Sequence, residues 1–288
     1  MSNGSDVIIF SKSRPWQLGQ LLRSAINFCD FDKYYIIYKK EPEYHANYQA
    51  VVTPFKKRVF LVNEENKILN AFYDAALKCK EYVSIMTDDM VFYDYFSSKN
   101  AHKCMRDNKV LSYHFKMNKS YDYCHSVSKK QLVPKNFITF EDNLIWEEND
   151  GNWDWFYPFD ITGSMYAKKD LLYIISKIYK CMSSGRPIKQ PNDIEMVGAE
   201  FLFHRGMDVT GKTRMACPIN RKCACIPLNH VGSFSFTPNI KSSLESTSYI
   251  NSNIFAEFNF DLDFFRSYNQ KSVHITDFKL IPSATNLF

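Results

Sequence analysis

Long apolar runs are absent from this sequence of 288 residues. A membrane-spanning helix needs roughly 18 consecutive apolar residues, and no stretch of the chain approaches that length. The first residues, MSNGSDVIIFSKSRPW, also lack the basic start, apolar run and small-residue cleavage site of a secretory signal. We therefore expect a cytoplasmic protein without a transmembrane segment, able to touch a membrane only peripherally. Its eight cysteines are then expected to be reduced thiols.

A basic tail is absent as well. The net charge of +5 is mild and is spread along the chain, whereas nucleic-acid-binding proteins gather lysine and arginine on one face or in one segment. We therefore expect no nucleic-acid partner. A nucleoside diphosphate or an anionic membrane surface would suit this charge equally well. The aromatic content of 16% decides nothing, because aromatic side chains pack in protein cores as well as against sugar rings.

The first 96 residues alternate between strand and helix patterns. Short apolar and β-branched runs predict strands at residues 7–10, 34–38, 58–62 and 82–86. Between them, apolar residues recur at helical spacing over 16–26 and 68–76. This order predicts an open, largely parallel sheet with helices on its faces. Ligands bind such sheets beyond the carboxyl ends of the strands, which is where the turn 11–15 and Asp88-Asp89 fall.

The rest of the chain is less regular. Residues 97–156 have no clear period, and we interpret them as strands and loops that shape a cleft. Residues 160–166 predict a strand that leads into a helix, and a second helix is predicted from Pro191 to near Gly206. The tail, 217–288, is aromatic-rich and irregular. Because neither a repeat nor a linker interrupts the chain, we predict a single domain.

An acidic pair, Asp88-Asp89, directly follows the apolar strand pattern YVSIM. The dipeptide by itself is more typical of a solvated turn. Its position after the fourth strand favours a site instead, because two buried carboxylates repel each other unless a cation is shared between them. Mg²⁺ or Mn²⁺ fits, since these ions take oxygen ligands from one or two carboxylates together with water and diphosphate.

Several segments resemble, in the same order, the motifs of GT-A glycosyltransferases of the family-2-like kind: FSKSRPWQL, YIIYKK…YHANYQAV, FLVNEENKILNAFYDAALKCKEYVSIMTDDMVF, YPFDITGSMYAKKDLL, PNDIE and SVHI. The resemblance implies a GT-A type fold, a Rossmann-like open mixed sheet flanked by helices. Residues 1–96 would be the nucleotide-sugar-binding half, and 97–288 the acceptor-side half with a C-terminal tail. The chain departs from the pattern at Thr87, where an aspartate often opens the acidic triplet.

For the metal, the resemblance implies that Asp89 coordinates Mn²⁺ or Mg²⁺, while Asp88 faces the nucleotide ribose or a water of the metal. His274 resembles a late histidine that completes the coordination, and an imidazole suits Mn²⁺ better than Mg²⁺. His230, which also follows a short strand pattern, is the rival. A zinc site of Cys217, Cys223, Cys225 and His230 is a weaker alternative, because the spacing C-x5-C-x-C-x4-H is unusual and ordinary packing explains the cysteines.

For the donor, candidates come from three places in the sequence. Ser11 and Arg14 lie in the turn after the first strand, where the arginine could pair with a diphosphate. Lys67 and Asn70 begin a helix and could touch base or phosphate, or could simply be solvated. The resemblance implies that the donor sugar lies against the segment around Gly163, with a simple bulge as the alternative. In that reading the sugar hydroxyls are reached by Asp160 or Thr162.

A general base is expected at the start of the helix that is predicted from Pro191. Asn192 and Glu195 have the spacing of a capping box, and Asp193 in the first turn favours the helix dipole, so these residues are explained without catalysis. Related inverting enzymes nevertheless place a carboxylate here to take the proton of the acceptor hydroxyl. The resemblance therefore implies Glu195, or else Asp193, as the base. Asp154, between two tryptophans that could stack on an acceptor sugar, is a further candidate.

The sequence thus predicts an enzyme that transfers a sugar from a UDP- or GDP-sugar to a glycan acceptor, with inversion and assistance from a divalent metal. One alternative is a nucleotidyltransferase that makes the sugar nucleotide, which can share this fold. Such enzymes usually carry a Gly-rich basic loop after the first strand, whereas SKSRPWQL is followed only by the distant Gly19. The other alternative is a non-catalytic module that binds carbohydrate or nucleotide.

Overall fold

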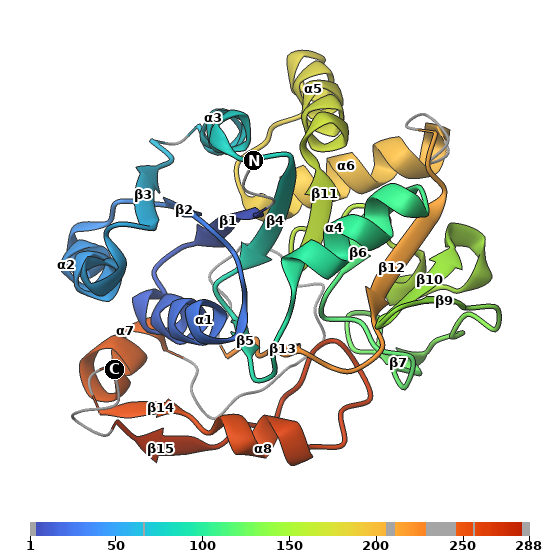
Figure 1. The fold of residues 1–288 in the computed structure, drawn as a ribbon. Helices are drawn as coiled ribbons and strands as arrows, with labels where there is room; N and C mark the ends of the chain where they lie inside the picture. Colours follow the sequence, from blue (N-terminus) through green and yellow to red (C-terminus); the bar gives the residue numbers. More distant parts are fainter. Residues whose placement is uncertain (1–3, 66, 206–210, 229–245, 256, 284–288) are drawn as a thin grey trace.

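The computed structural model describes residues 4–65, 67–205, 211–228, 246–255 and 257–283 (Figure 1). Within these residues, nine strands form one mixed sheet. In spatial order they are β3 (Val59–Asn63), β2 (Tyr34–Tyr38), β1 (Asp6–Ser11), β4 (Tyr82–Thr87), β11 (Ser164–Ala167), β6 (Val110–His114), β12 (Arg214–Pro218), β10 (Asn143–Glu147) and β9 (Ile138–Phe140). The expected open mixed sheet flanked by helices is confirmed.

Strand direction divides the sheet into two parts. β1, β2, β3 and β4 run parallel, with Ile9 opposite both Ile36 and Met86. β11 then pairs antiparallel with β4 and with β6. β12 is parallel to β6, and β10 and β9 follow as antiparallel strands. The parallel part therefore presents the carboxyl ends of four neighbouring strands at one edge, which is the position where open α/β sheets bind ligands.

Helices cover both faces of the sheet (Figure 1). One face packs on α3 (Ile68–Lys78), α5 (Lys168–Ser183) and α6 (Pro191–Arg205), and the other on α1 (Pro15–Phe28), α2 (Pro42–Val52) and α4 (Ser98–Asp107). Every residue of β1 is buried, because strands covered on both faces have no solvent side. This explains why the first strands appear in the sequence as continuous apolar runs.

Smaller elements surround the sheet. Two-stranded antiparallel pairs are formed by β5 (Met90–Phe92) with β13 (Cys223–Cys225), by β7 (Tyr123–Cys124) with β8 (Lys129–Lys130), and by β14 (Phe258–Phe260) with β15 (Leu280–Pro282). Short helices are α7 (Thr247–Tyr249) and α8 (Leu262–Ser267), the 3₁₀ turns Thr53–Phe55, Glu148–Asp150 and Trp153–Phe156, and a π-helical turn, Ile250–Ile254. The prediction of an irregular tail is therefore wrong in part.

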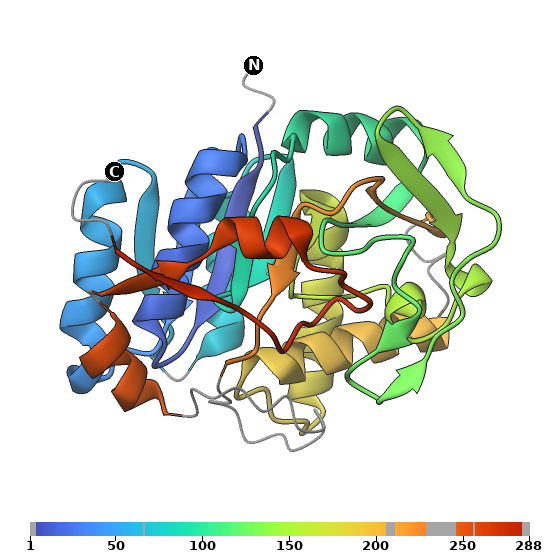
Figure 2. The same cartoon turned by 90° about the horizontal axis from the view of Figure 1, so that it is seen from below.

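The C-terminal elements pack beside α1 rather than on the sheet (Figure 2). Trp16 joins them to the first helix, since its ring packs on Phe260 with centroids 4.9 Å apart and its indole N–H donates to the carbonyl of Phe258 at 3.0 Å. After α8 the chain returns toward the sheet, where His274 forms a bridge with Cys225. The tail thereby delivers a polar side chain to the carboxyl edge of the sheet.

Two local predictions need correction. Residues 160–163 are not part of a strand, because Gly163 has a φ of +89° and β11 begins only at Ser164. The interpretation of 97–156 as strands and loops misses α4, whose N-cap Ser97 accepts a hydrogen bond from the backbone N–H of Asn100. Across the described ranges, no helix combines the length and the apolar character needed to cross a bilayer.

Candidate active site

A cavity of about 760 Å³ opens at the carboxyl edge of the sheet. The parallel strands contribute side chains at or just beyond their ends, namely Ser11 and Arg14 after β1, Lys39 after β2, Glu64 after β3 and Asp89 after β4. The order of the strands therefore fixes the order of these groups along the cavity. The wall continues past β4 with residues from the segments next to β11 and β6 and from the start of α6.

The first polar cluster is built on Asp88, which is fully buried. Its carboxylate forms an ion pair with Arg14 and accepts a hydrogen bond from Ser11 Oγ at 2.6 Å. Tyr48 supports both partners, because its hydroxyl is 2.7 Å from Ser11 Oγ and accepts from the backbone N–H of Arg14 at 3.2 Å. Burial raises the pKa of Asp88 to about 6, although Arg14 opposes the shift. Asp88 thus lies beneath Arg14 and does not line the cavity.

Asp89 does line the cavity. Arg14 Nη1 lies 3.9 Å from one of its carboxylate oxygens, and Thr87 donates to the other at 2.5 Å. Burial alone would raise the pKa of Asp89, but Arg14 and the Thr87 hydroxyl outweigh it, so the pKa falls below its usual value. Thr87 stands where the resembling enzymes often have an aspartate. Here its hydroxyl orients an ionised Asp89.

His274 lines the same cavity, held by backbone hydrogen bonds between its neighbours and Cys225. Its Nδ1 atom is buried and has no hydrogen-bond partner. Burial lowers the pKa of His274 to about 4, so the imidazole is neutral and able to act as a ligand. Among the described residues, no three His, Cys, Asp or Glu side chains are grouped as a metal site. Asp89 and His274 both line the cavity. A cation held by these two side chains would need its other ligands from diphosphate and water, as Mg²⁺ and Mn²⁺ sites allow.

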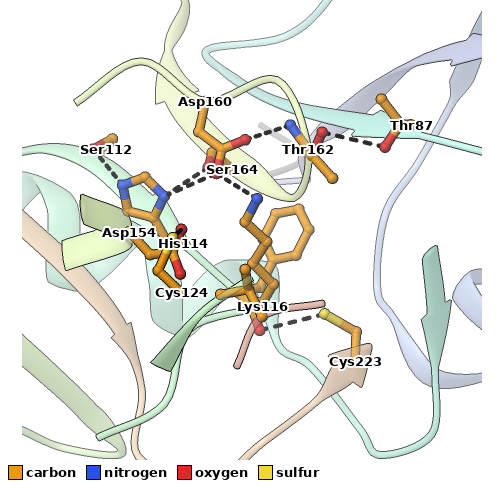
Figure 3. Close-up of polar contacts among 12 residues, drawn as sticks. Thr87, Ser112, His114, Lys116, Cys124, Asp154, Asp160, Thr162, Ser164 and Cys223 are labelled. Atoms are coloured by element: carbon orange, nitrogen blue, oxygen red, sulfur yellow. Dashed lines mark hydrogen bonds and ion pairs between the residues drawn. The ribbon is translucent and has the colours of Figure 1, made fainter. Parts of the chain in front are cut away.

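A second polar cluster surrounds Lys116, a residue that the sequence did not single out (Figure 3). Lys116 Nζ lies 2.6 Å from Asp160, whose other oxygen accepts from the backbone N–H of Thr162 at 2.7 Å. His114 lies 3.8 Å from Asp160 and is held between Ser112 and Ser164. Asp160 is therefore committed to this cluster, although it also lines the cavity.

In the second cluster, Lys116 and Asp160 are charged and His114 is neutral. Burial disfavours the charge on Asp160, but Lys116 and His114 outweigh it and hold the pKa of this carboxyl well below its usual range. Burial likewise opposes the charge on Lys116, and Asp160 outweighs it, so the pKa of the lysine is raised. Burial lowers the pKa of His114, which is neutral. A lysine among apolar residues gives a weak sequence signal, because its partner comes from another part of the chain.

Glu195 and Asp193, the two candidate bases, have different environments. α6 begins at Pro191, so the predicted capping box is wrong: Asp193 Oδ2 accepts from the backbone N–H groups of Lys189 at 2.7 Å and Gln190 at 3.1 Å. Asp193 thus stabilises the helix start. Glu195 instead lines the cavity. Burial and the nearby charge of Asp160 raise the pKa of Glu195 to about 8.

The remaining candidates lie elsewhere. Lys67 is exposed, and Asn70 accepts a hydrogen bond from Tyr179 at 2.9 Å; neither lines the cavity, although Ile68 between them does. Gly163 is packed under Met90, whose Cε atom would lie 2.7 Å from an added Cβ. The structure therefore explains Gly163 by a left-handed backbone and close packing. His230 lies outside the described residues.

Among the described residues, the three cysteines of the zinc site considered as an alternative are not part of a group of metal ligands. Cys217, Cys223 and Cys225 are buried free thiols, and burial raises the pKa of each. Cys223 donates to the carbonyl of Phe115 at 3.4 Å (Figure 3). Within the described part of the chain they belong to the packing around the cavity, and Cys225 lies in its wall.

The sheet and its cavity define a class: a Rossmann-like α/β protein with ionised groups at the carboxyl ends of its strands. No family model matches the sequence. The chain is, however, 31% identical over 220 residues to the bifunctional glycosyltransferase pgtA of Dictyostelium discoideum. The chain is therefore a homologue of a glycosyltransferase, and the resemblance expected from its motifs is confirmed.

The shared region is 68% of this chain but only 28% of the Dictyostelium protein, so the chain spans less than a third of that relative. Among solved structures, a 4-diphosphocytidyl-2C-methyl-D-erythritol synthase from Anaerococcus prevotii is similar with a TM-score of 0.37 and 11% identity, over 66% of this chain and 79% of that one. A likeness this slight carries no argument about fold or activity.

Proposed function

We propose that this chain transfers a sugar from a nucleoside-diphosphate sugar to a hydroxyl group of a glycan acceptor. One observation carries the proposal: Asp89, His274 and Glu195 line one cavity at the carboxyl edge of the sheet. That cavity combines candidate groups for a leaving diphosphate and for an attacking hydroxyl. The homology to a glycosyltransferase supports the same reaction class.

The donor nucleotide is proposed to bind at the end of the cavity formed by β1, β2 and β3. Phe10, Ile37 and Ile68 supply apolar surface there, and Lys39 and Glu64 supply polar groups. Such a surface suits a nucleobase, which has apolar faces and a hydrogen-bonding edge. The diphosphate would then reach Lys12 and Arg14, both of which line the cavity, with Arg14 beside the carboxylates that follow β4. This assignment agrees with the role expected for residues 1–96.

A divalent cation is proposed to bind Asp89 and His274. The fit rests on an ionised carboxylate and on a neutral imidazole whose buried Nδ1 has no partner. This mixed oxygen and nitrogen set favours Mn²⁺ over Mg²⁺. When bound, the cation would stabilise negative charge on the departing diphosphate. Arg14, paired with Asp88 and close to Asp89, adds a fixed positive charge of its own.

Glu195 is the proposed general base of an inverting reaction. Its pKa of about 8 lies near neutral pH, which is where a carboxylate accepts a proton from a hydroxyl most effectively. The hydroxyl of Tyr157 hydrogen-bonds its carboxylate and can orient it. Asp193 is unsuited to this role because its carboxylate is used by the helix start.

Thermal unfolding with UDP-, GDP- and CMP-sugars, each with and without Mn²⁺, tests donor binding. We expect one nucleotide sugar to stabilise the protein and Mn²⁺ to enlarge the effect. Release of nucleoside diphosphate then tests turnover. Binding without turnover would indicate a binding module, and release of pyrophosphate from a nucleoside triphosphate and a sugar phosphate would indicate a nucleotidyltransferase. No response to any nucleotide sugar would contradict the proposal.

A further inference from the structure

The wall of the cavity beyond the second cluster contains a tight turn, Trp153–Phe156. Trp153 and Asp154 both line the cavity, together with Cys124 and Ser126. Burial raises the pKa of both Asp154 and Glu195, and Lys116 is close enough to both to oppose that rise. The turn therefore lines the same cavity as Glu195, the group proposed to activate the acceptor hydroxyl.

Trp153 has an unusual backbone for so large a side chain. Its φ is +53°, a left-handed conformation that bulky residues rarely adopt without a functional or structural constraint. The indole is nevertheless 41% exposed, so its own burial does not compensate for this conformation. The exposed Lys129 lies with its Nζ 5.8 Å from the ring centre and can move aside. Trp153 thus contributes a partly exposed aromatic side chain to the wall of the cavity, at a conformational cost.

The turn is locked in place by its neighbours. Trp155 is fully buried, donates through Nε1 to the carbonyl of Tyr121 at 2.9 Å, and accepts through its carbonyl from Trp146 at 2.9 Å. At Gly151, an added Cβ would lie 2.5 Å from Trp155 Cβ, so the chain passes too closely for any side chain. A rigid support of this kind fixes the exposed ring at low entropic cost to a ligand.

Asp154 has one satisfied and one unsatisfied carboxylate oxygen. Cys124 Sγ donates to Oδ1 at 3.3 Å, whereas Oδ2 is buried without a hydrogen-bond partner (Figure 3). The backbone N–H of Asp154 donates to Gln131 Oε1 at 3.2 Å, which constrains the backbone at this residue. A buried acceptor without a partner is unfavourable until a donor reaches it, and the hydroxyl of a bound sugar is such a donor.

We propose that Trp153 and Asp154 form the subsite for the acceptor carbohydrate. The indole stacks on the apolar face of a pyranose ring, and Asp154 Oδ2 accepts a hydrogen bond from one of its hydroxyl groups. This inference rests on the proposed function in one respect, which is that the sugar bound here is the acceptor of the transferred sugar. The binding of a sugar ring at this place does not depend on it.

The test compares Trp153→Gly with Trp153→Phe. Glycine removes the ring but favours a positive φ, so this variant should fold at least as stably as the parent chain. With methyl glycosides of glucose, galactose, N-acetylglucosamine, mannose and fucose as acceptors, we expect Trp153→Gly to raise the acceptor KM about tenfold or more. Trp153→Phe should stay within about threefold, and the affinity for the donor and its slow hydrolysis by water should not change.

Asp154→Asn provides the second variant. It keeps the shape of the side chain but replaces one oxygen by an amide that donates, and we expect the acceptor KM to rise with donor affinity unchanged. Two results would overturn the subsite: an unchanged acceptor KM in Trp153→Gly, or an equal loss of donor affinity there. If the wild-type chain neither binds nor hydrolyses any nucleotide sugar, the proposed function fails. Saturation-transfer NMR with the same methyl glycosides then tests the subsite alone, because contact with the sugar should disappear in Trp153→Gly.

Discussion

Two buried clusters of charged side chains adjoin the cavity, and they differ in the balance of positive and negative charge. Arg14 shares its guanidinium between Asp88 and Asp89, so one positive group faces two carboxylates. Lys116 has Asp160 as its close partner, with a neutral His114 beside them. The first cluster therefore has an excess of negative charge, and the second is neutral.

The pKa values reflect this difference. Burial raises the pKa of Asp88 to about 6 even though Arg14 is paired with it, whereas Lys116 and His114 hold the pKa of Asp160 well below its usual range. The first cluster is incomplete, in the sense that its excess negative charge can accept a further cation. The second cluster is complete, because its charges cancel, and it serves as a fixed framework. We infer that the first cluster binds the donor with its cation and that the second positions the acceptor side. The hydroxyls of Thr87 and Thr162, 3.3 Å apart, join the two.

The largest effect is expected from Glu195, which lies beside the second cluster. Glu195→Gln removes the proposed proton acceptor while keeping the size of the side chain, so kcat should fall about 10²- to 10⁴-fold. Donor affinity, measured by thermal unfolding, should stay the same. Asp193→Asn is the matched control: its kcat should remain within a few-fold, and stability should fall by about 1 kcal/mol because the helix start loses a charged acceptor. Comparable losses of kcat in the two variants would contradict the assignment.

Lys116→Met breaks the second cluster. The change leaves Asp160 buried without its cation, and breaking a buried pair in this way costs about 3–5 kcal/mol. Urea unfolding would measure the loss, and Lys116→Met combined with Asp160→Asn should recover much of it. The control is Lys103→Met, which breaks an exposed pair with Glu141 and should cost about 0–1 kcal/mol. Equal costs at the two lysines would show that the second cluster is not a buried framework.

Asp89→Asn tests the incomplete cluster. The amide keeps the shape but loses the charge that a divalent cation needs, so Mn²⁺ should no longer strengthen donor binding, a loss of at least about tenfold in affinity. Chelation by EDTA should weaken donor binding by the wild-type chain and leave that of the variant unchanged. Asp94→Asn, at a half-exposed carboxylate paired with Lys222, is the control and should respond to Mn²⁺ like the parent chain. Metal-independent donor binding by the wild-type chain would remove the role given to Asp89.

The two clusters also differ in how well their residues can be predicted from the sequence. The first follows strands that are covered on both faces, so their apolar runs predict β1 and β4 within a residue or two and place Asp89 at a strand end. The second depends on Lys116, which pairs with a carboxylate from another segment of the chain. No local periodicity encodes that contact, and a lysine by itself predicts a solvated position.

Local geometry explains the other differences. α4 escapes prediction because only Ala101, Cys104 and Met105 among its ten residues are buried apolar side chains. The capping box fails because Pro191 takes the first helical position, so Asn192 lies inside the helix and not at its N-cap. Asp193, rather than Glu195, then reaches back to the turn. The sequence suggests that Glu195 serves only as a member of a capping box, and this explanation can be rejected only when the boundary of the helix is known.

The pH dependence of the reaction gives a smaller effect. Burial and Asp160 raise the pKa of Glu195 to about 8, and the ionised form is the base, so kcat/KM should rise about tenfold between pH 7 and pH 9. The residual activity of Glu195→Gln should lack this rise. The effect on stability has the opposite sign: because the pKa of Glu195 is about 8 in the folded state and 4.5 in the unfolded chain, the stability contribution is fully present below about pH 4.5, declines as the pH rises to about 8, and is level above that. An activity profile that falls from pH 7 to pH 9 would contradict the base assignment.

The smallest expected effect concerns Gly163, which lies between the clusters and packs against Met90. Gly163→Ala places a Cβ on a backbone with φ of +89°, and we expect a loss of about 1–2 kcal/mol in stability. Gly185→Ala has a similar φ of +97° but no atom within 4 Å of the new Cβ, so it measures the backbone cost alone. The difference between the two variants gives the cost of moving Met90. If Gly163→Ala instead leaves stability unchanged and weakens donor binding, the segment contacts the donor sugar and its role is not confined to packing.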